Sequence, residues 1–119
     1  MRVLVCGSRR IERCTALLQR MTDLPPGTTI IEGGATGIDS AARLYAQALR
    51  LLIEEYKPDW KVHGSGAGLV RNTRMLREGK PELVIAVPGS DSRGTWDMVR
   101  KAQKAGVPVE IIRHRGDGH

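Results

Sequence analysis

Four short segments of the chain combine glycine with side chains that can bind an anion, and each follows an apolar run. They occupy residues 7–9, 33–39, 64–72 and 88–97. Glycine lets backbone N–H groups approach a phosphate closely, and the arginine guanidinium is a planar fork of donors that matches phosphate oxygens. Ligands of open α/β sheets bind beyond the carboxyl ends of the strands, so these segments predict one anion-binding site at that edge.

The second of these segments has the form of a phosphate-binding loop over residues 33–37. Its closely spaced glycines lead into a predicted helix that begins at Ile38, and the dipole of a helix favours an anion at its start. The segment is not the dinucleotide fingerprint, which follows the first strand, and the chain has no Gly-Lys-Ser/Thr of a P-loop. A tight turn that only packs a helix against the sheet has the same pattern, so both interpretations remain open at this point.

Charged side chains in or beside the glycine segments are the candidates for ligand contacts. Arg9, Arg71 and Arg93 would converge on a phosphate, although most of the 19 Lys and Arg residues must lie on the solvated surface. Asp39 and Asp97 each follow a glycine-rich loop within the first turn of a predicted helix. There a carboxylate either caps the helix, stabilised by its dipole, or contacts a ribose or a base.

Aromatic side chains are scarce, with two Trp, two Tyr and no Phe. A groove for single-stranded nucleic acid needs aromatic platforms on which bases stack, and the sequence offers few of them. Trp96 is the exception, because it lies in the last glycine segment and could cover a nucleobase. The complete set of candidate ligand-binding residues is Gly7, Ser8, Arg9, Gly33, Gly34, Ala35, Thr36, Gly37, Asp39, Arg71, Asn72, Pro88, Gly89, Ser90, Arg93, Gly94, Thr95, Trp96 and Asp97.

The spacing of the apolar residues predicts five strands that alternate with four helices. Strands are expected at residues 3–6, 28–31, 60–63, 83–87 and 107–112. Helices are expected to carry the apolar stripes of residues 11–21, 38–53, 69–76 and 95–105. Parallel strands need helical crossovers, so the alternation predicts a single three-layer α/β domain with a mainly parallel five-stranded sheet. The domain is expected to span residues 1–112 and to be followed by a flexible basic tail at 113–119.

Length, composition and charge restrict the class of protein. A chain of 119 residues with 40% hydrophobic content builds one core. Its apolar runs are far shorter than the roughly 20 residues of a membrane span, so we expect a cytoplasmic protein without membrane contact. Cys6 and Cys14 lie in apolar segments without metal-ligand spacing, which predicts core residues, no metal and no other cofactor. The net charge of +6 favours an anionic partner and is compatible with weak, non-specific binding of nucleic acid.

Five segments, in order, resemble the pattern of the SLOG superfamily in its small stand-alone bacterial and phage branch. They are Gly7-Ser8-Arg9, residues 33–39, Asp59-Trp60, residues 67–75 and residues 88–99, and together they span most of the chain. The superfamily unites Lonely Guy phosphoribohydrolases, the Rossmann-like part of DNA-processing protein A and sensor domains for nucleotide-derived signals. The resemblance implies a Rossmann-like fold and a pocket for a nucleotide or a nucleotide derivative at the sheet edge already indicated.

The resemblance extends only in part to catalytic residues. Lonely Guy enzymes hydrolyse the N-glycosidic bond of nucleoside monophosphates with an Arg in Arg-Lys-x-x-Met and a Glu in Pro-Gly-Gly-x-Gly-Thr-x-x-Glu. Arg71 with Met75 is similar to the first segment, but in the second Ser90 replaces a Gly, the loop is longer, and Met98 stands where the Glu is expected. Asp97 lies one residue earlier, which turns its carboxylate by about 100° on a helix. The catalytic set is therefore unknown, and Arg71 and Asp97 are its candidates if the protein is an enzyme.

We therefore expect a sensor or sequestering protein that binds a nucleotide-derived small molecule, such as an ADP-ribose derivative or a cyclic nucleotide. A nucleoside 5′-monophosphate phosphoribohydrolase of the Lonely Guy type is the second hypothesis. The third is a nucleic-acid-binding accessory protein in DNA processing. The oligomeric state stays open, and a homodimer or a higher homo-oligomer is compatible with the sequence.

Overall fold

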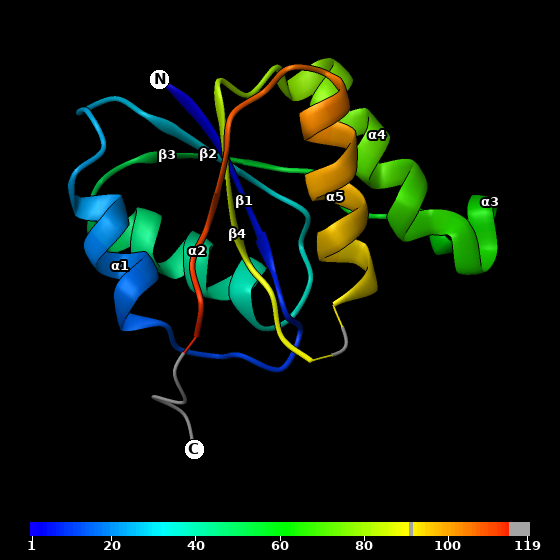
Figure 1. Ribbon diagram of the computed structural model, residues 1–119, viewed down its shortest axis with the longest axis horizontal. Helices are drawn as coiled ribbons and strands as arrows, with labels where there is room; N and C mark the ends of the chain where they lie inside the picture. The colour runs from blue at the N-terminus through cyan, green and yellow to red at the C-terminus, as the bar shows by residue number, and fades with distance from the viewer. Residues whose placement is uncertain (91, 115–119) are drawn as a thin grey trace.

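Five parallel strands form the centre of the molecule (Figure 1). The computed structural model describes residues 1–90 and 92–114. The strands are β1 (Arg2–Gly7), β2 (Thr29–Glu32), β3 (Leu52–Glu55), β4 (Leu83–Val87) and β5 (Val109–Ile111), and their order in the sheet is β3-β2-β1-β4-β5. Within the described residues all neighbouring strands are parallel, which confirms the predicted α/β class. The strand order reverses beside β1, and a crevice forms at the carboxyl edge of a sheet at such a point.

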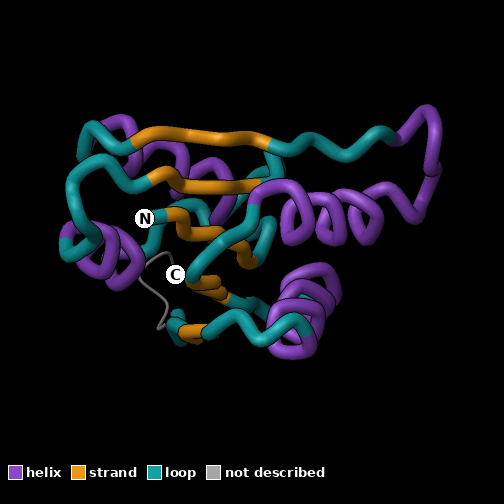
Figure 2. Tube along the Cα trace, turned by 90° about the horizontal axis from the view of Figure 1, so that it is seen from above, coloured by secondary structure: helices purple, strands orange, loops and turns teal. Residues whose placement is uncertain are grey.

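Helices cover both faces of the sheet and complete three layers (Figures 1 and 2). α1 (Thr15–Thr22) and α2 (Ile38–Ala48) pack on one face, and α4 (Ala67–Gly79) and α5 (Arg93–Lys104) pack on the other. A short helix α3 (Trp60–His63) and a 3₁₀ turn η1 (Gly64–Gly66) precede α4. Figure 2 shows that α3 projects well beyond the carboxyl ends of the strands, so the start of α4 lies at the edge where ligand residues are expected.

Alternate side chains of the central strand β1 belong to opposite layers of the core. Val3 and Val5 pack with the buried residues of α1 and α2, whereas Leu4 and Cys6 pack with those of α4 and α5. All four side chains are buried. Because helices cover both faces of this parallel strand, it reads as a continuous apolar run, which is the signal that located it in the sequence.

The third strand is not where the sequence predicted it. The helix expected at residues 38–53 is shorter, because α2 ends at Ala48, Arg50 takes a left-handed backbone conformation (φ 58°), and β3 follows. Leu52 and Ile53 continue the helical spacing of the α2 stripe. Periodicity alone therefore could not separate the helix from the edge strand behind it.

Residues 60–63, predicted as a strand, form the helix α3 instead. The side chain of Asp59 accepts a hydrogen bond from the backbone N–H of Val62 at 3.1 Å and caps the start of this helix. The strand propensity of Trp60 and Val62 obscured that start signal. The predicted number of strands is correct only because this false strand compensates for the one hidden in the α2 prediction.

No helix in the described part of the chain is both long and apolar enough to cross a membrane. Of the tail predicted at residues 113–119, the structure describes Arg113 and His114. Residues 115–119 lie outside the described residues.

Candidate functional site

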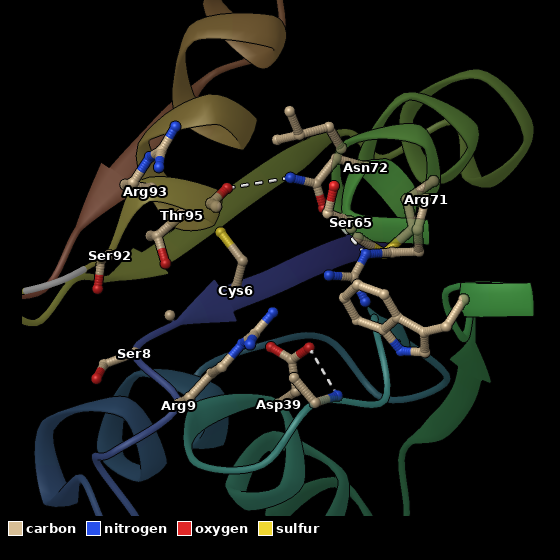
Figure 3. A pocket seen from close by; sticks show the side chains of 17 residues that line it. Cys6, Ser8, Arg9, Asp39, Ser65, Arg71, Asn72, Ser92, Arg93 and Thr95 are labelled. Atoms are coloured by element: carbon tan, nitrogen blue, oxygen red, sulfur yellow. Dashed lines mark hydrogen bonds between the residues drawn. The ribbon is translucent and has the colours of Figure 1, made fainter. Parts of the chain in front are cut away.

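A cavity of about 390 Å³ lies at the carboxyl edge of the sheet (Figure 3). The end of β1, the β2–α2 loop, the segment from α3 into α4 and the β4–α5 loop all contribute residues to its lining. Its volume falls in the range of small-molecule sites. All four glycine-containing segments of the sequence therefore meet at one place.

The candidate ligand-binding residues divide into two groups. Those that line the cavity are Gly7, Ser8, Arg9, Ala35, Asp39, Arg71, Asn72, Arg93, Gly94 and Thr95. Those that do not line it are Gly33, Gly34, Thr36, Gly37, Pro88, Gly89, Ser90, Trp96 and Asp97. The lining also includes residues that the sequence did not single out as ligand contacts: Cys6, Trp60, Ser65, Gly68, Leu69, Met75 and Ser92.

Three backbone donors of the glycine loop between β2 and α2 are already bonded to side chains of the chain itself. The N–H groups of Gly33 and Ala35 donate to Asp39 Oδ2 at 3.1 and 3.3 Å, and that of Gly34 donates to Glu32 Oε1 at 2.6 Å. The N–H of Ile38 donates to the carbonyl of Ser8 at 3.0 Å. The amides of Gly33, Gly34 and Ala35 are therefore occupied by carboxylates of the chain itself, which counts against the phosphate cradle expected at residues 33–37.

Asp39 is the buried anion at the centre of this arrangement. Its side chain is only 6% exposed, and burial raises its pKa to about 6, against the opposing effects of Arg71, the two loop amides and Arg9. In Figure 3 the carboxylate lies between the side chains of Arg9 and Arg71, with one oxygen bonded to the loop. Asp39 therefore holds the loop closed while its other oxygen remains on the cavity side.

Arg71 reaches from α4 across the cavity to the β2–α2 loop. Its Nη1 donates to the carbonyl of Gly33, and its Nε donates to Asn72 Oδ1 at 3.1 Å. Burial lowers the pKa of the guanidinium, and Asp39 acts in the opposite direction. A Cβ at position 33 would overlap the guanidinium, so the missing side chain of Gly33 makes room for Arg71.

Asn72 connects α4 with the start of α5. Its Nδ2 donates to the carbonyl of Gly94 at 3.0 Å and to Asp97 Oδ2 at 3.1 Å. Asp97 also pairs with Lys101 at 2.9 Å, and Lys101 Nζ donates to the carbonyl of Leu69 at 3.0 Å. Asp97 is the fifth residue of α5, beyond the first turn, and its carboxylate ties two helices together. The expectation that it caps the helix or contacts a ligand is thus replaced by a structural role.

The loop between β4 and α5 differs from the first glycine loop in its backbone donors. Gly89 N–H donates to Ser92 Oγ at 2.6 Å, but the N–H groups of Arg93, Gly94 and Thr95 at the start of α5 have no acceptor among the described residues. A helix start with unbonded amides is an anion site by its dipole and its donors. This loop therefore retains the capacity that the first loop lacks.

Trp60 lines the cavity, and Trp96 does not. Trp96 packs against the core formed with α4 and α5, and the guanidinium of Arg113 lies 6.0 Å from its ring centroid. Trp60 begins α3 and is 50% exposed. The segment Asp59-Trp60 belongs to the pattern that the sequence shares with the SLOG superfamily. Because Trp60 was predicted to begin a strand, it was not recognised as a residue that lines the cavity.

A pair of carboxyl groups behind the first glycine loop escaped the sequence analysis. Glu32 and Glu55 are register partners on β2 and β3. Glu32 is buried, and desolvation together with its hydrogen bond to Glu55 raises its pKa to about 8, whereas the same bond lowers the pKa of Glu55. Oε2 of Glu32 has no hydrogen-bond partner among the described residues, and the raised pKa keeps Glu32 protonated near neutral pH, so that its O–H can form a hydrogen bond to the carboxylate of Glu55. Only the correct position of β3 would have revealed the pair.

Cys6 and Cys14 are both buried, in line with the predicted core positions. Cys6 also lines the cavity, where burial raises the pKa of its thiol far above the ordinary value. Within the described ranges, no three His, Cys, Asp or Glu side chains gather as metal ligands would.

Comparison with known proteins relates the chain to one family. The model of a family described as "YspA, cpYpsA-related SLOG family" matches residues 1–63. Gene 61 protein of Mycobacterium phage D29 is 38% identical over 117 residues, which cover 91% of this chain and 93% of that protein.

Two solved structures of DNA processing protein A are also similar. The Helicobacter pylori protein, described for its single-stranded DNA binding mode, overlays with a TM-score of 0.66 and 23% identity over 98% of this chain and 67% of its own. The Streptococcus pneumoniae protein overlays with a TM-score of 0.47 and 16% identity, over 92% of this chain and 58% of its own. The first of these overlays confirms the Rossmann-like class of the fold.

Proposed function

This chain belongs to the YspA, cpYpsA-related SLOG family, and from that premise we propose that it binds a nucleotide or a nucleotide-derived small molecule, as a sensor or sequestering protein. The observation that carries the proposal is the start of α5, whose first amides have no acceptor among the described residues and which shares one cavity with Arg9, Arg71 and Arg93. Unbonded amides and guanidinium groups together supply the charge-assisted donors that a phosphate needs. The volume of about 390 Å³ suits a small ligand.

Binding without hydrolysis is the better-supported form of this function. In the Lonely Guy pattern the catalytic carboxylate comes from the helix that follows the Pro-Gly-Gly loop, and the sequence offered Asp97 for that role. Asp97 instead holds Asn72 and Lys101 and does not line the cavity. We therefore expect no release of free base from nucleoside monophosphates.

The test begins with the nucleotide that the purified protein carries. Heat denaturation followed by mass spectrometry identifies a released ligand, and calorimetric titration then measures its affinity alongside ADP-ribose and 3′,5′-cyclic AMP. Arg9 is exposed, and its guanidinium has no hydrogen-bond partner among the described residues, so Arg9→Ala removes a ligand contact without opening the fold. We expect this variant to bind roughly 10- to 150-fold more weakly, the effect of losing one charged hydrogen bond.

Arg100→Ala is the matched control. Arg100 is exposed on α5 and does not line the cavity, and its substitution removes the same charge as Arg9→Ala. This variant should bind the nucleotide as the parent does. Equal affinity of Arg9→Ala and the parent, or the absence of binding by every nucleotide tested, would show that the assigned site is wrong.

Binding of single-stranded DNA is the second candidate function. It is supported by the shared fold with the Helicobacter pylori protein and by the net charge of +6, to which exposed Arg100 and Lys104 contribute. Fluorescence anisotropy with a thymidine oligonucleotide should show weak binding that fades steeply between roughly 50 and 200 mM salt. Tight binding that survives the higher salt, weakens in the Arg100→Ala/Lys104→Ala variant and resists competition by mononucleotides would make DNA the principal ligand.

A further inference from the structure

The groups that line the cavity follow one another across the sheet in the order of the parts of a nucleotide. Trp60 comes from the segment after β3, Asp39 follows β2, Ser8 follows β1, and Thr95 follows β4. The strand order is β3-β2-β1-β4, and neighbouring strands lie about 4.8 Å apart, so three intervals span roughly 14 Å. If the cavity binds a nucleotide, as proposed above, this order predicts which end of the cavity holds the phosphate and which end holds the base.

The β4 end of the cavity suits the phosphate. The amides at the start of α5, which have no acceptor among the described residues, lie there, and the buried side chains of Ser92 and Thr95 line the wall beside them. Ser8 joins them from β1, because a Cβ on Gly89 would lie within 2.6 Å of Ser8 Oγ and the missing side chain lets the two loops meet. Donors from two strands therefore converge on the same end.

The β2 position suits hydroxyl groups rather than a phosphate. Asp39 is fixed through one oxygen to two loop amides, which leaves the second oxygen as an acceptor on the cavity side (Figure 3). A carboxylate repels a phosphate but accepts hydrogen bonds from a sugar, and a ribose lies between phosphate and base. At neutral pH the group is ionised, since its pKa is about 6. It can then accept from two adjacent hydroxyls, as acidic residues in other nucleotide sites do.

The β3 end suits a planar ring. Trp60 lines the cavity there and is 50% exposed, which leaves the surface of its ring uncovered. Aromatic side chains bind bases by stacking, and this contact tolerates any base.

We propose that Asp39 recognises the ribose cis-diol of a nucleotide whose phosphate lies at the start of α5 and whose base lies against Trp60. The ligand is therefore a ribonucleotide with both free hydroxyls. A 2′-deoxyribonucleotide lacks one of the two donors, and in a DNA strand the second hydroxyl is esterified as well.

Calorimetric titration of the unmodified protein with the four ribonucleoside 5′-monophosphates and their 2′-deoxy counterparts tests this directly. For the base that binds best, we expect the deoxy form to bind roughly 10-fold more weakly or worse, because a buried carboxylate oxygen loses its donor. This comparison needs no variant, so it does not depend on how a substitution folds.

Two variants assign the effect to residues. Asp39→Asn keeps an oxygen for the amides of Gly33 and Ala35, and it should lower affinity for the ribonucleotide more than for the deoxy form, which makes only one of the two hydroxyl contacts. Trp60→Ala should weaken both forms by a similar factor, with Val62→Ala as its control, since Val62 is an exposed neighbour in α3 that does not line the cavity.

The results separate the two levels of inference. If no nucleotide binds, the proposed function fails, and the assignment of Asp39 fails with it. If nucleotides bind and the ribo and deoxy forms bind equally, the cavity is correct and the role of Asp39 is wrong. A preserved ribose preference in folded Asp39→Asn, verified by its thermal unfolding, would also overturn that role.

Discussion

Two glycine loops stand side by side at the same edge of the sheet, and they are in opposite states. In the loop of residues 33–37 the amides of Gly33, Gly34 and Ala35 donate to Asp39 and Glu32, whereas the amides of Arg93, Gly94 and Thr95 at the start of α5 have no acceptor among the described residues. Both loops contain glycine and small polar residues, and both precede a helix. In the first loop the acceptors are two acidic side chains, Asp39 and Glu32.

The comparison shows that glycine before a helix is not enough to identify an anion site. The helix dipole acts in both loops, but a phosphate also needs free donors, and a carboxylate that has taken them adds repulsion. In the first loop the carboxylates of Asp39 and Glu32 occupy the amides that a phosphate would need. The contribution of this loop is to fix Asp39 and Arg71 in position, while the second loop remains available to a ligand.

Gly37→Ala should have the largest effect, because it breaks the closed loop. Gly37 has φ 76°, and its Cβ would lie 2.5 Å from the backbone carbon of Arg9, so the substitution meets both backbone strain and a rigid neighbour. We expect a loss of roughly 3 kcal/mol or more in the free energy of unfolding, measured by urea denaturation.

Gly94→Ala makes the matching change in the open loop. No atom lies within 4 Å of a Cβ at this position, and its φ is not positive. Alanine is the better helix former, so stability should be unchanged or slightly higher. Equal destabilisation by the two substitutions would contradict the distinction between the loops.

Glu32→Gln should remove a pH dependence that belongs to the closed loop. The pKa of Glu32 rises from 4.5 to about 8 on folding, so the stability it contributes is complete below pH 4.5 and is lost as the pH rises through about 8. Glutamine cannot ionise, yet it keeps an acceptor for Gly34 N–H and a donor for Glu55. At about pH 9 the variant should be roughly 2 kcal/mol more stable than the parent, with little difference near pH 5.

Urea denaturation from about pH 5 to about pH 9 measures this difference. Glu12→Gln is the control, because Glu12 is exposed and the substitution should leave the slope of the parent intact. Parallel loss of stability in the parent and in Glu32→Gln would show that Glu32 carries no proton in the folded protein.

Asn72→Ala should have the smallest of the destabilising effects, because it removes hydrogen bonds but leaves the backbone and the core in place. The variant loses the bonds to Gly94, Asp97 and Arg71, but Asp97 keeps its pair with Lys101. We expect a loss of about 1–2 kcal/mol in the free energy of unfolding. Thr73→Ala, at the next and exposed position of α4, should cost less, and the reverse order would show that Asn72 is not a link.

The sequence predicted those elements whose burial it encodes directly. β1 and β4 are covered on both faces and read as apolar runs, and the breaks at their ends place the ligand-side loops. β3 could not be found, because its Leu52 is 60% exposed and the apolar residues of this edge strand continue the stripe of α2. Because β3 was missed, residues 60–63 were predicted as a strand, and the position of Trp60 in the cavity lining was missed as well.

The position of the candidate site was predictable, but the roles within it were not. Parallel strands bring their carboxyl ends together whatever the side chains are, so Arg9, Asp39, Arg71 and Thr95 could be placed at one edge. Which donors remain free depends on contacts between residues distant in the sequence. Asp97 beside Asn72 is an example, and no local pattern reveals it.

The close fit between Gly33 and Arg71 also restricts how this chain can change over generations. A side chain at position 33 would displace the guanidinium, which would give up its hydrogen bond to the carbonyl of Gly33. A smaller residue at position 71 imposes no such cost, because it leaves Gly33 unhindered. In an alignment of relatives, a residue other than glycine at position 33 should therefore go together with a loss of Arg71 more often than the loss of Arg71 goes together with a change at position 33.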